Sequence, residues 1–376
     1  MADPSDGDPP DAELGRPRRR SSIRTYGAAV YNDRGEAISV ELALTIFRQM
    51  VRTRALEERA IKMSKSGEAY FWIGGPGEEA FNVCLGMQIR RGAGPAFDYV
   101  HLHYRNAGVL LAMGMSMQDH FRQLAMTKTD RHSWGRNFVG HYAVPEWNVI
   151  PVTSVIEVQY AMAPGTALMQ KRHGGEGLTA VVGGEAGTAE GDFECCLNWS
   201  SLPGRETPTL ICVTNNHWGI STASEGVHGE KSVTERAIPY RMDAATVDGN
   251  DAIAMWLALD RAMRHCRRER KPYLLEAMVS RLHGHSSSSG AMRNWAESDC
   301  LALFEQRLID QGATDVDEVA KLKLDAKKEA DEAVVEIMKE ERPSADDVLT
   351  HTYAPSPVDV VYPGDYTGLP QRSVKN

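Results

Sequence analysis

Residues 181–193 read VVGGEAGTAEGDF and end an apolar run in a cluster of glycines and acids. A short apolar run bounded by glycines is typical of a buried strand. This run delivers one carboxylate, that of Glu185, to a turn that otherwise consists of small residues. A carboxylate at the end of a core strand is costly unless a cation or hydrogen bonds compensate it. The turn therefore indicates a functional site, at which a cation or hydrogen-bond donors compensate the carboxylate of Glu185.

Strands and helices alternate around this turn. Strands are expected over 178–185, 208–216, 244–250 and 272–286, the last running into a loop. Helices are expected over 39–67, 75–92, 109–126 (one helix or a pair), 192–202 and 251–271. This alternation predicts an α/β fold, with a parallel sheet that helices cover on both faces.

Composition divides the chain into four parts. Residues 1–38 begin with a stretch rich in Pro, Asp and Arg that lacks an apolar core, which predicts a mostly disordered arm and argues against a secretory signal. Residues 39–310 are the expected domain. Residues 311–345 predict a charged helix with a thin apolar stripe, and residues 346–376 predict an extended tail.

Charge, hydropathy and cysteine content argue against several classes of protein. The formal net charge of −9 gives the whole chain no electrostatic attraction to nucleic acid. No apolar run reaches the roughly 18–20 residues of a membrane helix. The six cysteines form no CxxC pair, which argues against structural zinc and predicts reduced thiols in a cytoplasm. A nucleotide-binding module is a weak interpretation because the sequence has no GxxxxGK[ST] loop.

Two predicted strands end in residues suited to a metal. Glu185 follows one strand, and Asn215 and Asn216 end the next. Parallel strands joined by a helix point the same way, so these side chains are expected to lie together at one sheet edge. Carboxylate and amide oxygens suit Mg²⁺, which completes its shell with water and phosphates. An ordinary glycine-rich turn and an asparagine cap remain the alternative.

Several stretches together resemble the alpha subunit of the decarboxylating first component of 2-oxoacid dehydrogenase complexes. The motif GGEAGTAEGDF followed by VTNNHWGIST resembles the thiamine diphosphate motif, and the resemblance runs from about residue 39 to 362. It includes HYRNAGVLLAMG, VTSVIEVQYAMAPGTALMQKR and SRLHGHSSS. YRNAGVLL and VDGND look closest to the branched-chain type. The resemblance implies a transketolase-like thiamine diphosphate-binding fold with helical N- and C-terminal extensions.

The resemblance also implies roles for individual residues. It implies that Mg²⁺ is held by the side chains of Glu185 and Asn216 and by the carbonyl of Trp218. It implies cofactor binding by Tyr104, Arg105, Ser154, Ile156, Gly184, Ala186, Gly187 and Arg281, and catalysis by His285 with assistance from His283. Ser154 and Ile156 are expected beside the aminopyrimidine ring of the cofactor. The residues alone leave open a surface ion pair for Arg105, core packing for Ile156 and solvated histidines in the loop.

The implied reaction is oxidative decarboxylation of a branched-chain 2-oxoacid, with transfer of the acyl group to lipoyl-lysine of the acyltransferase component. Thiamine enzymes need a glutamate directed at the pyrimidine ring, and the resemblance assigns it to a separate beta subunit in an α₂β₂ heterotetramer. Pyruvate and acetoin dehydrogenase subunits are alternatives within this chemistry. A degenerate, non-catalytic paralogue is an alternative of another class.

Three departures from the family pattern put details in doubt. Ala186 stands where the turn usually has Gly. Val155 and Val158 replace residues that help to bind K⁺ in branched-chain relatives, although Gln159 matches a polar position of that site. The residues after His285 read SSSSGAMRN, where relatives usually carry Asp.

Overall fold

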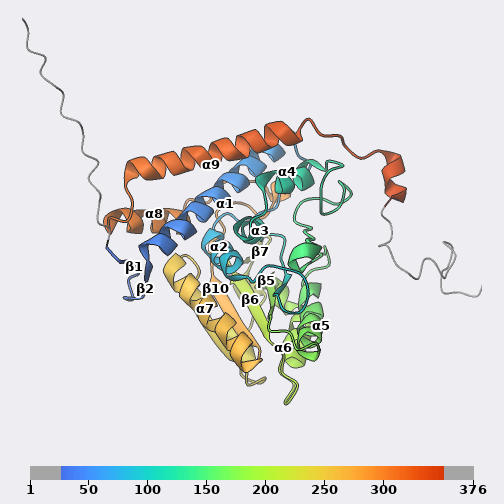
Figure 1. Ribbon diagram of the computed structural model, residues 1–376, viewed down its shortest axis with the longest axis vertical. Coiled ribbons are helices and arrows are strands. Elements are labelled where there is room, and N and C mark those ends of the chain that lie inside the picture. Colours follow the sequence, from blue (N-terminus) through green and yellow to red (C-terminus); the bar gives the residue numbers. More distant parts are fainter. Residues whose placement is uncertain (1–26, 351–376) are drawn as a thin grey trace, which may run out of the picture.

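The computed structural model describes residues 27–350 (Figure 1). Within this range six strands form one parallel sheet in the order β4-β3-β5-β6-β10-β9. They are β3 (Tyr99–His101), β4 (Val149–Ile150), β5 (Thr179–Gly184), β6 (Thr209–Asn215), β9 (Asp243–Asp248) and β10 (Tyr273–Met278). The predicted parallel α/β fold is confirmed.

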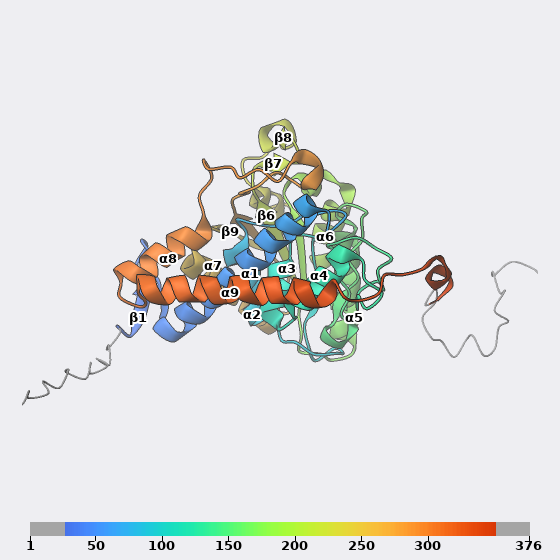
Figure 2. The ribbon, with the colours of Figure 1, turned by 90° about the horizontal axis from the view of Figure 1, so that it is seen from above.

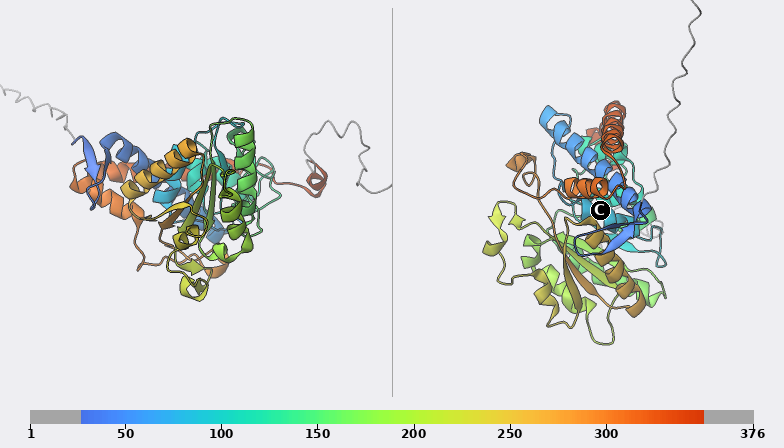
Figure 3. Two further views of the ribbon diagram at one scale, coloured as in Figure 1. Left: turned by 90° about the horizontal axis from the view of Figure 1, so that it is seen from below. Right: turned by 90° about the vertical axis from the view of Figure 1, so that its left-hand side faces the viewer.

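Helices cover both faces of the sheet. Figure 3 shows the strands between α7 on one side and α5 on the other. The α-helices of the described range are α1 (Val40–Ser66), α2 (Glu79–Gln88), α3 (Ala107–Met113), α4 (Met117–Ala125), α5 (Val158–Arg172), α6 (Gly191–Ser200), α7 (Ala252–Glu269), α8 (Cys300–Asp310) and α9 (Val316–Ile337). The expected helix or pair over 109–126 is a pair, because Gly114 takes a left-handed conformation (φ 108°) that ends α3.

The two ends of the chain differ in part from the prediction. Residues 1–26 of the predicted arm and residues 351–376 of the predicted tail lie outside the described range. Strands β1 (Ala29–Tyr31) and β2 (Ala37–Ser39) form an antiparallel hairpin, so the predicted disorder does not hold there. Asn32 explains the hairpin, because its side-chain carbonyl accepts hydrogen bonds from the backbone of Arg34 at 3.1 Å and Glu36 at 2.9 Å.

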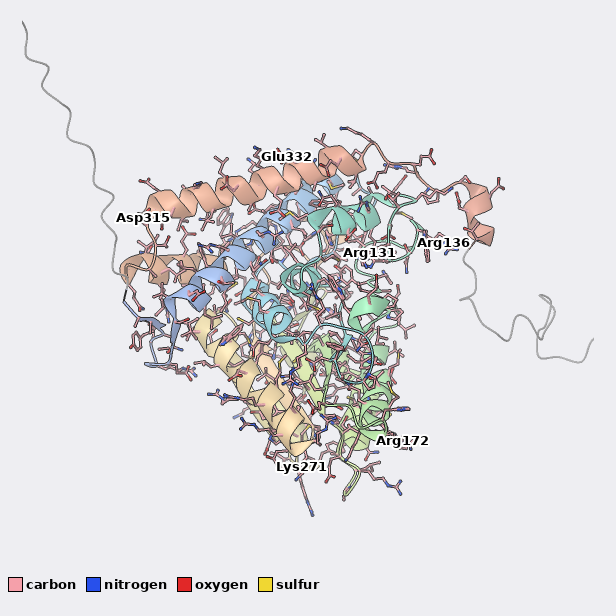
Figure 4. The ribbon with its side chains drawn as sticks, in the orientation of Figure 1. Arg131, Arg136, Arg172, Lys271, Asp315 and Glu332 are labelled. Atoms are coloured by element: carbon pink, nitrogen blue, oxygen red, sulfur yellow. The ribbon has the colours of Figure 1, made fainter. Side chains whose placement is uncertain are left out.

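The predicted charged C-terminal helix corresponds to α9. Figure 2 shows α9 lying across α1 and reaching α4, and the two contacts bury its apolar stripe. Arg52 of α1 pairs with Glu329 of α9 at 2.5 Å. Figure 4 places Glu332 of α9 at one end of the molecule, and Arg172 and Lys271 at the other. Lys271 lies two residues before the start of β10, so that other end holds the amino ends of the strands.

A buried ion cluster joins α1, α2 and α8. The Nε of Arg54 lies 2.5 Å from Glu79, and its two terminal nitrogens lie 2.9 Å from the oxygens of Asp299. Burial by itself raises the pKa of Asp299, but the hydrogen bonds from Arg54 and Arg293 hold that pKa well below its ordinary value. The same carboxylate accepts from Leu301 N and caps α8.

We expect Arg54→Met to lower the free energy of unfolding by about 3–5 kcal/mol, because it leaves Glu79 buried without its cation. Arg52→Met is the matched control on the same helix, and its loss is expected to stay below about 1 kcal/mol because its ion pair is partly exposed. Urea unfolding of the two variants measures both values. Equal losses would show that the buried cluster contributes no more than a surface pair.

Candidate functional site

The turn after β5 meets the end of β6 at the carboxyl edge of the sheet. Gly184 of β5 pairs with Thr214 of β6, so Glu185, the first residue after β5, lies beside Asn215, the last residue of β6. The backbone N–H of Glu185 donates to the Thr214 carbonyl at 3.2 Å and continues the pairing by one residue. The adjacency expected from the sequence is thus present.

A cavity of about 400 Å³ opens at this edge. It brings together most of the expected site residues, namely Tyr104, Arg105, Ser154, Ile156, Gly184, Glu185, Ala186, Gly187, Asn216, Trp218 and His285. Phe71, Ile73, Phe138 and Val139 add an apolar wall. Ile156 is 54% exposed, so its side chain is not core packing within this chain. The cavity is therefore assembled from segments that lie far apart in the sequence.

Glu185 is 1% exposed and has two neutral hydrogen-bond donors. The hydroxyl of Ser224 donates to one carboxylate oxygen at 3.1 Å, and the backbone N–H of Asn216 donates to the other at 3.3 Å. The Asn216 side-chain oxygen accepts from the backbone N–H of Trp218 at 3.1 Å. These hydrogen bonds compensate the buried carboxylate in part, and they leave lone pairs that can bind a cation.

The donor set fits a hard divalent cation. Within residues 27–350 no three His, Cys, Asp or Glu side chains cluster as a transition-metal site requires. The carboxylate of Glu185, the amide oxygen of Asn216 and the carbonyl of Trp218 are all oxygen ligands. Mg²⁺ takes few protein oxygens and completes its shell with water and phosphate, so these residues fit it.

Arg105 is buried rather than paired at the surface. Its guanidinium donates to the Gly74 carbonyl at 3.1 Å and to His285 Nδ1 at 3.0 Å, and it lies 3.9 Å from Glu78. The surface ion pair that the residues alone allowed is therefore not formed. A buried guanidinium at a cavity wall is suited to an anionic ligand such as a diphosphate.

The contact with Arg105 sets the tautomer of His285. A guanidinium can only donate hydrogen bonds, so Nδ1 of His285 is the acceptor. The neutral ring therefore carries its hydrogen on Nε2. Burial, together with the charges of Arg105 and Arg281, lowers the pKa of His285 to about 4. The ring is therefore neutral at pH 7, as expected from the sequence.

We expect Arg105→Gln to raise the pKa of His285 above about 4, because removal of a nearby cation favours the charged imidazolium. Burial remains, so the pKa should stay below the ordinary value near 6.5. Histidine ¹⁵N NMR across a pH series measures this shift. Arg281→Gln is the control and should raise the pKa less. An unchanged or lowered value in Arg105→Gln would contradict the electrostatic account.

Two expected residues do not line the cavity. Arg281 donates to the Ile220 carbonyl at 2.9 Å, and its guanidinium lies 5.8 Å from the ring centre of Trp218, so it braces the loop after Asn216. Nδ1 of His283 lies 3.4 Å from the Ala291 carbonyl. Assistance from His283 in catalysis stays a prediction.

The structure shows how the chain accommodates two of the departures from the family pattern, Ala186 and the serines after His285. The methyl group of Ala186 lies against Gly219, where any side chain would come within 2.6 Å of it. The serines after His285 form a short 3₁₀ helix, Ser287–Ser289, with a capping box in which Ser286 and Ser289 bond each other's backbone. Ser287 also exchanges hydrogen bonds with the backbone of Trp72 at 2.8 Å and 3.2 Å. These hydrogen bonds hold the loop in one conformation without using an aspartate.

Sequence reasoning missed four titratable residues of the cavity, His103, His141, Glu157 and Glu190. Glu157 has a left-handed backbone (φ 62°) and a buried carboxyl against Gly183 and Gly187. Burial and the charge of Glu185 raise the pKa of Glu157 to about 8, although the backbone N–H of Gly184 opposes this. A single acid within the apolar run SVIEVQY was the signal that could have identified it.

Gln159, which matches a polar position of the K⁺ site of relatives, makes side-chain hydrogen bonds within the chain. The Gln159 side-chain amide donates to the Val182 carbonyl at 3.1 Å and to Glu157 at 3.4 Å. Potassium binding stays a prediction that the sequence itself puts in doubt.

Comparison with known proteins settles the family. Residues 47–346 match the family described as dehydrogenase E1 component. The chain belongs to the dehydrogenase E1 component family. The family predicted from the motifs is confirmed, and thiamine diphosphate is the cofactor known for its members.

Among curated relatives of this E1 chain, the 2-oxoisovalerate dehydrogenase subunit alpha of Bacillus subtilis is 30% identical over 75% of this chain and 86% of its own. The mitochondrial 2-oxoisovalerate dehydrogenase subunit alpha 2 of Arabidopsis thaliana is 28% identical over 87% of this chain and 70% of its own. The pyruvate dehydrogenase E1 component subunit alpha of B. subtilis is 24% identical over 87% and 88%. Across residues 27–350 every helix of the E1 chain is too short or too polar to cross a membrane.

Proposed function

We propose that this chain is the alpha subunit of a branched-chain 2-oxoacid dehydrogenase E1 component. It takes part in oxidative decarboxylation of the 2-oxoacid and in transfer of the acyl group to lipoyl-lysine of the acyltransferase component. The observation that carries the proposal is the meeting of an oxygen-ligand pair, a buried arginine and a neutral histidine in one cavity. Such a set is not needed by a degenerate, non-catalytic paralogue.

The cofactor end of the cavity is the turn after β5. Glu185, Asn216 and the Trp218 carbonyl would hold Mg²⁺, which would neutralise part of the diphosphate charge. Gly184 and Gly187 let the diphosphate approach the backbone, and Tyr104 and Arg105 bind its oxygens. When bound, thiamine diphosphate supplies the electron sink that decarboxylation needs.

His285 supplies the proton chemistry beside the cofactor. Its Nε2 carries a hydrogen and its ring stays neutral at pH 7, so it can donate a hydrogen bond to an oxygen of the reacting group. It can take up a proton during acyl transfer, and then return it, once Arg105 releases Nδ1, the ring nitrogen with the lone pair. Ser154 and Ile156 line the part of the cavity that would receive the cofactor ring, and Arg281 holds the neighbouring loop.

The apolar wall favours a branched alkyl substrate over pyruvate. Phe71 and Phe138 meet edge to face with ring centres 5.4 Å apart, and Ile73 and Val139 extend the surface. Each buried methylene of a substrate gains about 0.8 kcal/mol on such a surface, so larger side chains bind better than a methyl group. This agrees with the greater identity to 2-oxoisovalerate relatives.

A beta subunit completes the site in an α₂β₂ heterotetramer. Val155 (64% exposed), Ile156 and Ile220 (58% exposed) present apolar side chains at or beside the mouth of the cavity. An exposed apolar group of this kind is typical of a surface that a partner covers. The beta subunit contributes the glutamate directed at the pyrimidine ring, and the lipoyl domain reaches the assembled site.

The test is turnover by the chain together with its beta subunit, with thiamine diphosphate, Mg²⁺ and an artificial electron acceptor. We expect decarboxylation of 3-methyl-2-oxobutanoate to exceed that of pyruvate in kcat/KM. Preference for pyruvate would assign the chain to a pyruvate dehydrogenase instead. No turnover of any 2-oxoacid by a complex that still binds the cofactor would overturn the enzymatic proposal and favour the paralogue.

A further inference from the structure

The loop that carries half of the proposed metal site has no core of its own. It runs over residues 216–232 and includes the short hairpin of β7 (Trp218–Gly219) and β8 (Thr222–Ala223), which Figure 2 shows at the edge of the molecule. None of residues 217–232 is buried, and a cavity of about 360 Å³ with a mostly polar lining lies against the loop. Apolar packing therefore does little to fix the loop in place.

Both ends of the loop are tied to one carboxylate on the neighbouring strand β10, that of Glu276, which is 0% exposed. At the near end, the side-chain amide of Asn215 donates to Oε1 of Glu276 at 2.8 Å. At the far end, the backbone N–H of Val233 donates to Oε1 at 3.3 Å, and the Ser232 hydroxyl donates to Oε2. The hydroxyl of Thr246 in β9 donates to Oε2 at 3.1 Å. Glu276 thus joins the two ends of the loop.

The four donors to Glu276 are all neutral, being one side-chain amide, one backbone N–H and two hydroxyls. A buried carboxylate depends on such hydrogen bonds, because each bond that is lost leaves a desolvated polar group unpaired. Three of the four donors flank or end the loop. Movement of the loop away from β10 would therefore uncover a cost in free energy that an apolar contact of the same size would not impose.

The contact with Glu276 also sets the orientation of the Asn215 amide. A carboxylate accepts and a backbone N–H donates, so Nδ2 of Asn215 faces Glu276 and Oδ1 faces the N–H of His217, at 3.0 Å. This turn holds His217 in a left-handed conformation (φ 64°) that a residue other than Gly seldom adopts. Asn216 repeats the turn by accepting from the N–H of Trp218 at 3.1 Å. The path of the backbone through both proposed ligands thus starts from Glu276.

Resting on the proposed function, we propose that Glu276 is a positioning residue for the magnesium ligands of this loop. By holding the two ends of the loop together, it keeps Asn216 and the Trp218 carbonyl beside Glu185. Glu276 does not line the cofactor cavity, so it acts on the site only through the residues that it binds. Groups that orient metal ligands from outside the coordination shell contribute about 10–100-fold to metal affinity.

The experiment measures binding of thiamine diphosphate by calorimetry, on the complex with its beta subunit, over a series of Mg²⁺ concentrations. Glu276→Met keeps the length of the side chain and removes both acceptor oxygens. It should raise the Mg²⁺ concentration that gives half of the maximal binding about 10–100-fold. This concentration reports on the metal ligands, which a general loss of stability would not single out.

Glu276→Gln is the conservative variant. Its amide oxygen can still accept from Asn215 and Val233, which only donate, and its NH₂ group can donate to the hydroxyls of Ser232 and Thr246, which also accept. Because every contact is kept, the Mg²⁺ requirement should change less than about twofold. Thr246→Val is the matched control, since it removes one donor and leaves both ends of the loop on the carboxylate, and it should also stay within about twofold.

Hydrogen exchange of the ligand-free complex gives a readout that needs no cofactor. Residues 217–232 should exchange faster in Glu276→Met than in the unaltered complex, and at the unaltered rate in Glu276→Gln. If Glu276→Met does not fold, Ser232→Ala replaces it, because this variant releases only one contact at the far end of the loop. It should raise the Mg²⁺ requirement about threefold, the effect of one hydrogen bond.

The outcomes separate the role of Glu276 from the proposed function. No binding of thiamine diphosphate by the unaltered complex at any Mg²⁺ concentration would overturn the proposed function. An unaltered Mg²⁺ requirement in Glu276→Met, or in Ser232→Ala where that variant replaces it, would overturn the positioning role alone, as would unaltered hydrogen exchange in the loop. Equal losses in Glu276→Gln and Glu276→Met would overturn it too, because the amide keeps both ends of the loop in place.

Discussion

Replacing Glu185 by Gln is expected to weaken the magnesium-dependent binding of thiamine diphosphate at least about 100-fold. Loss of a group that merely orients a metal ligand already costs about 10–100-fold in affinity, and Glu185 is proposed as a ligand itself. The change is isosteric, and a Gln oxygen can still accept from Ser224 or Asn216. Calorimetry on the complex with the beta subunit, with and without Mg²⁺, measures the effect.

The control for this prediction is Glu190→Gln. Glu190 lines the same cavity at the far end of the turn but is exposed, so its removal should change affinity less than about threefold. The midpoint of thermal unfolding of ligand-free Glu185→Gln should match that of the unaltered chain. A buried carboxylate that has only two neutral hydrogen-bond donors does not stabilise the fold by its charge. Full affinity in Glu185→Gln, or binding that ignores Mg²⁺, would refute the metal assignment.

Replacing His285 by Ala is expected to reduce acyl transfer to a lipoyl domain about 10²–10⁴-fold, the usual contribution of a positioned general acid or base. Decarboxylation measured with an artificial electron acceptor should fall less than about tenfold, because the cofactor carries that step. The two assays use the same preparation of the complex, so an error in cofactor loading affects both and cancels in their ratio.

His283→Ala is the comparison. Its ring is directed at the Ala291 carbonyl and does not line the cavity, so both assays should fall little and by similar factors. Equal losses in the two assays for His285→Ala would contradict the prediction that His285 acts in acyl transfer while the cofactor carries decarboxylation. A larger effect of His283→Ala on acyl transfer would move the proton-transferring role to that residue.

The sequence predicted the central strands and the sheet edge where they end because those strands are apolar, bounded by Gly, Pro or Asn, and long enough to show a pattern. β5 and β6 were recognised in this way, and the meeting of Glu185 and Asn216 followed from the rule for parallel strands. The edge strand β4 has two residues and β3 has three, too few for any periodic pattern, so both were missed. Yet β3 leads directly into Tyr104 and Arg105.

Polar residues that are buried by tertiary contacts were harder to predict from the sequence than the strands. The sequence of Glu157 or His141 gives no sign of burial, since each becomes buried only where distant backbone closes over it. The carboxyl of Glu157 fits because Gly183 and Gly187 have no side chains, a relation between segments about thirty residues apart. The contact of His141 Nδ1 with the Phe138 carbonyl at 3.0 Å is likewise made with backbone, which no pattern of side chains reveals.

The hydrogen bond between Arg105 and His285 joins residues that are 180 positions apart. A chain still emerging from the ribosome holds the first of them long before the second exists, so no partial product contains a complete cavity. Closing so long a loop has an entropic cost that only the finished core repays. A ligand of this cavity therefore binds the fully native chain and stabilises that state by mass action. The fraction of chains that bind the ligand therefore reports the fraction of chains that are fully folded.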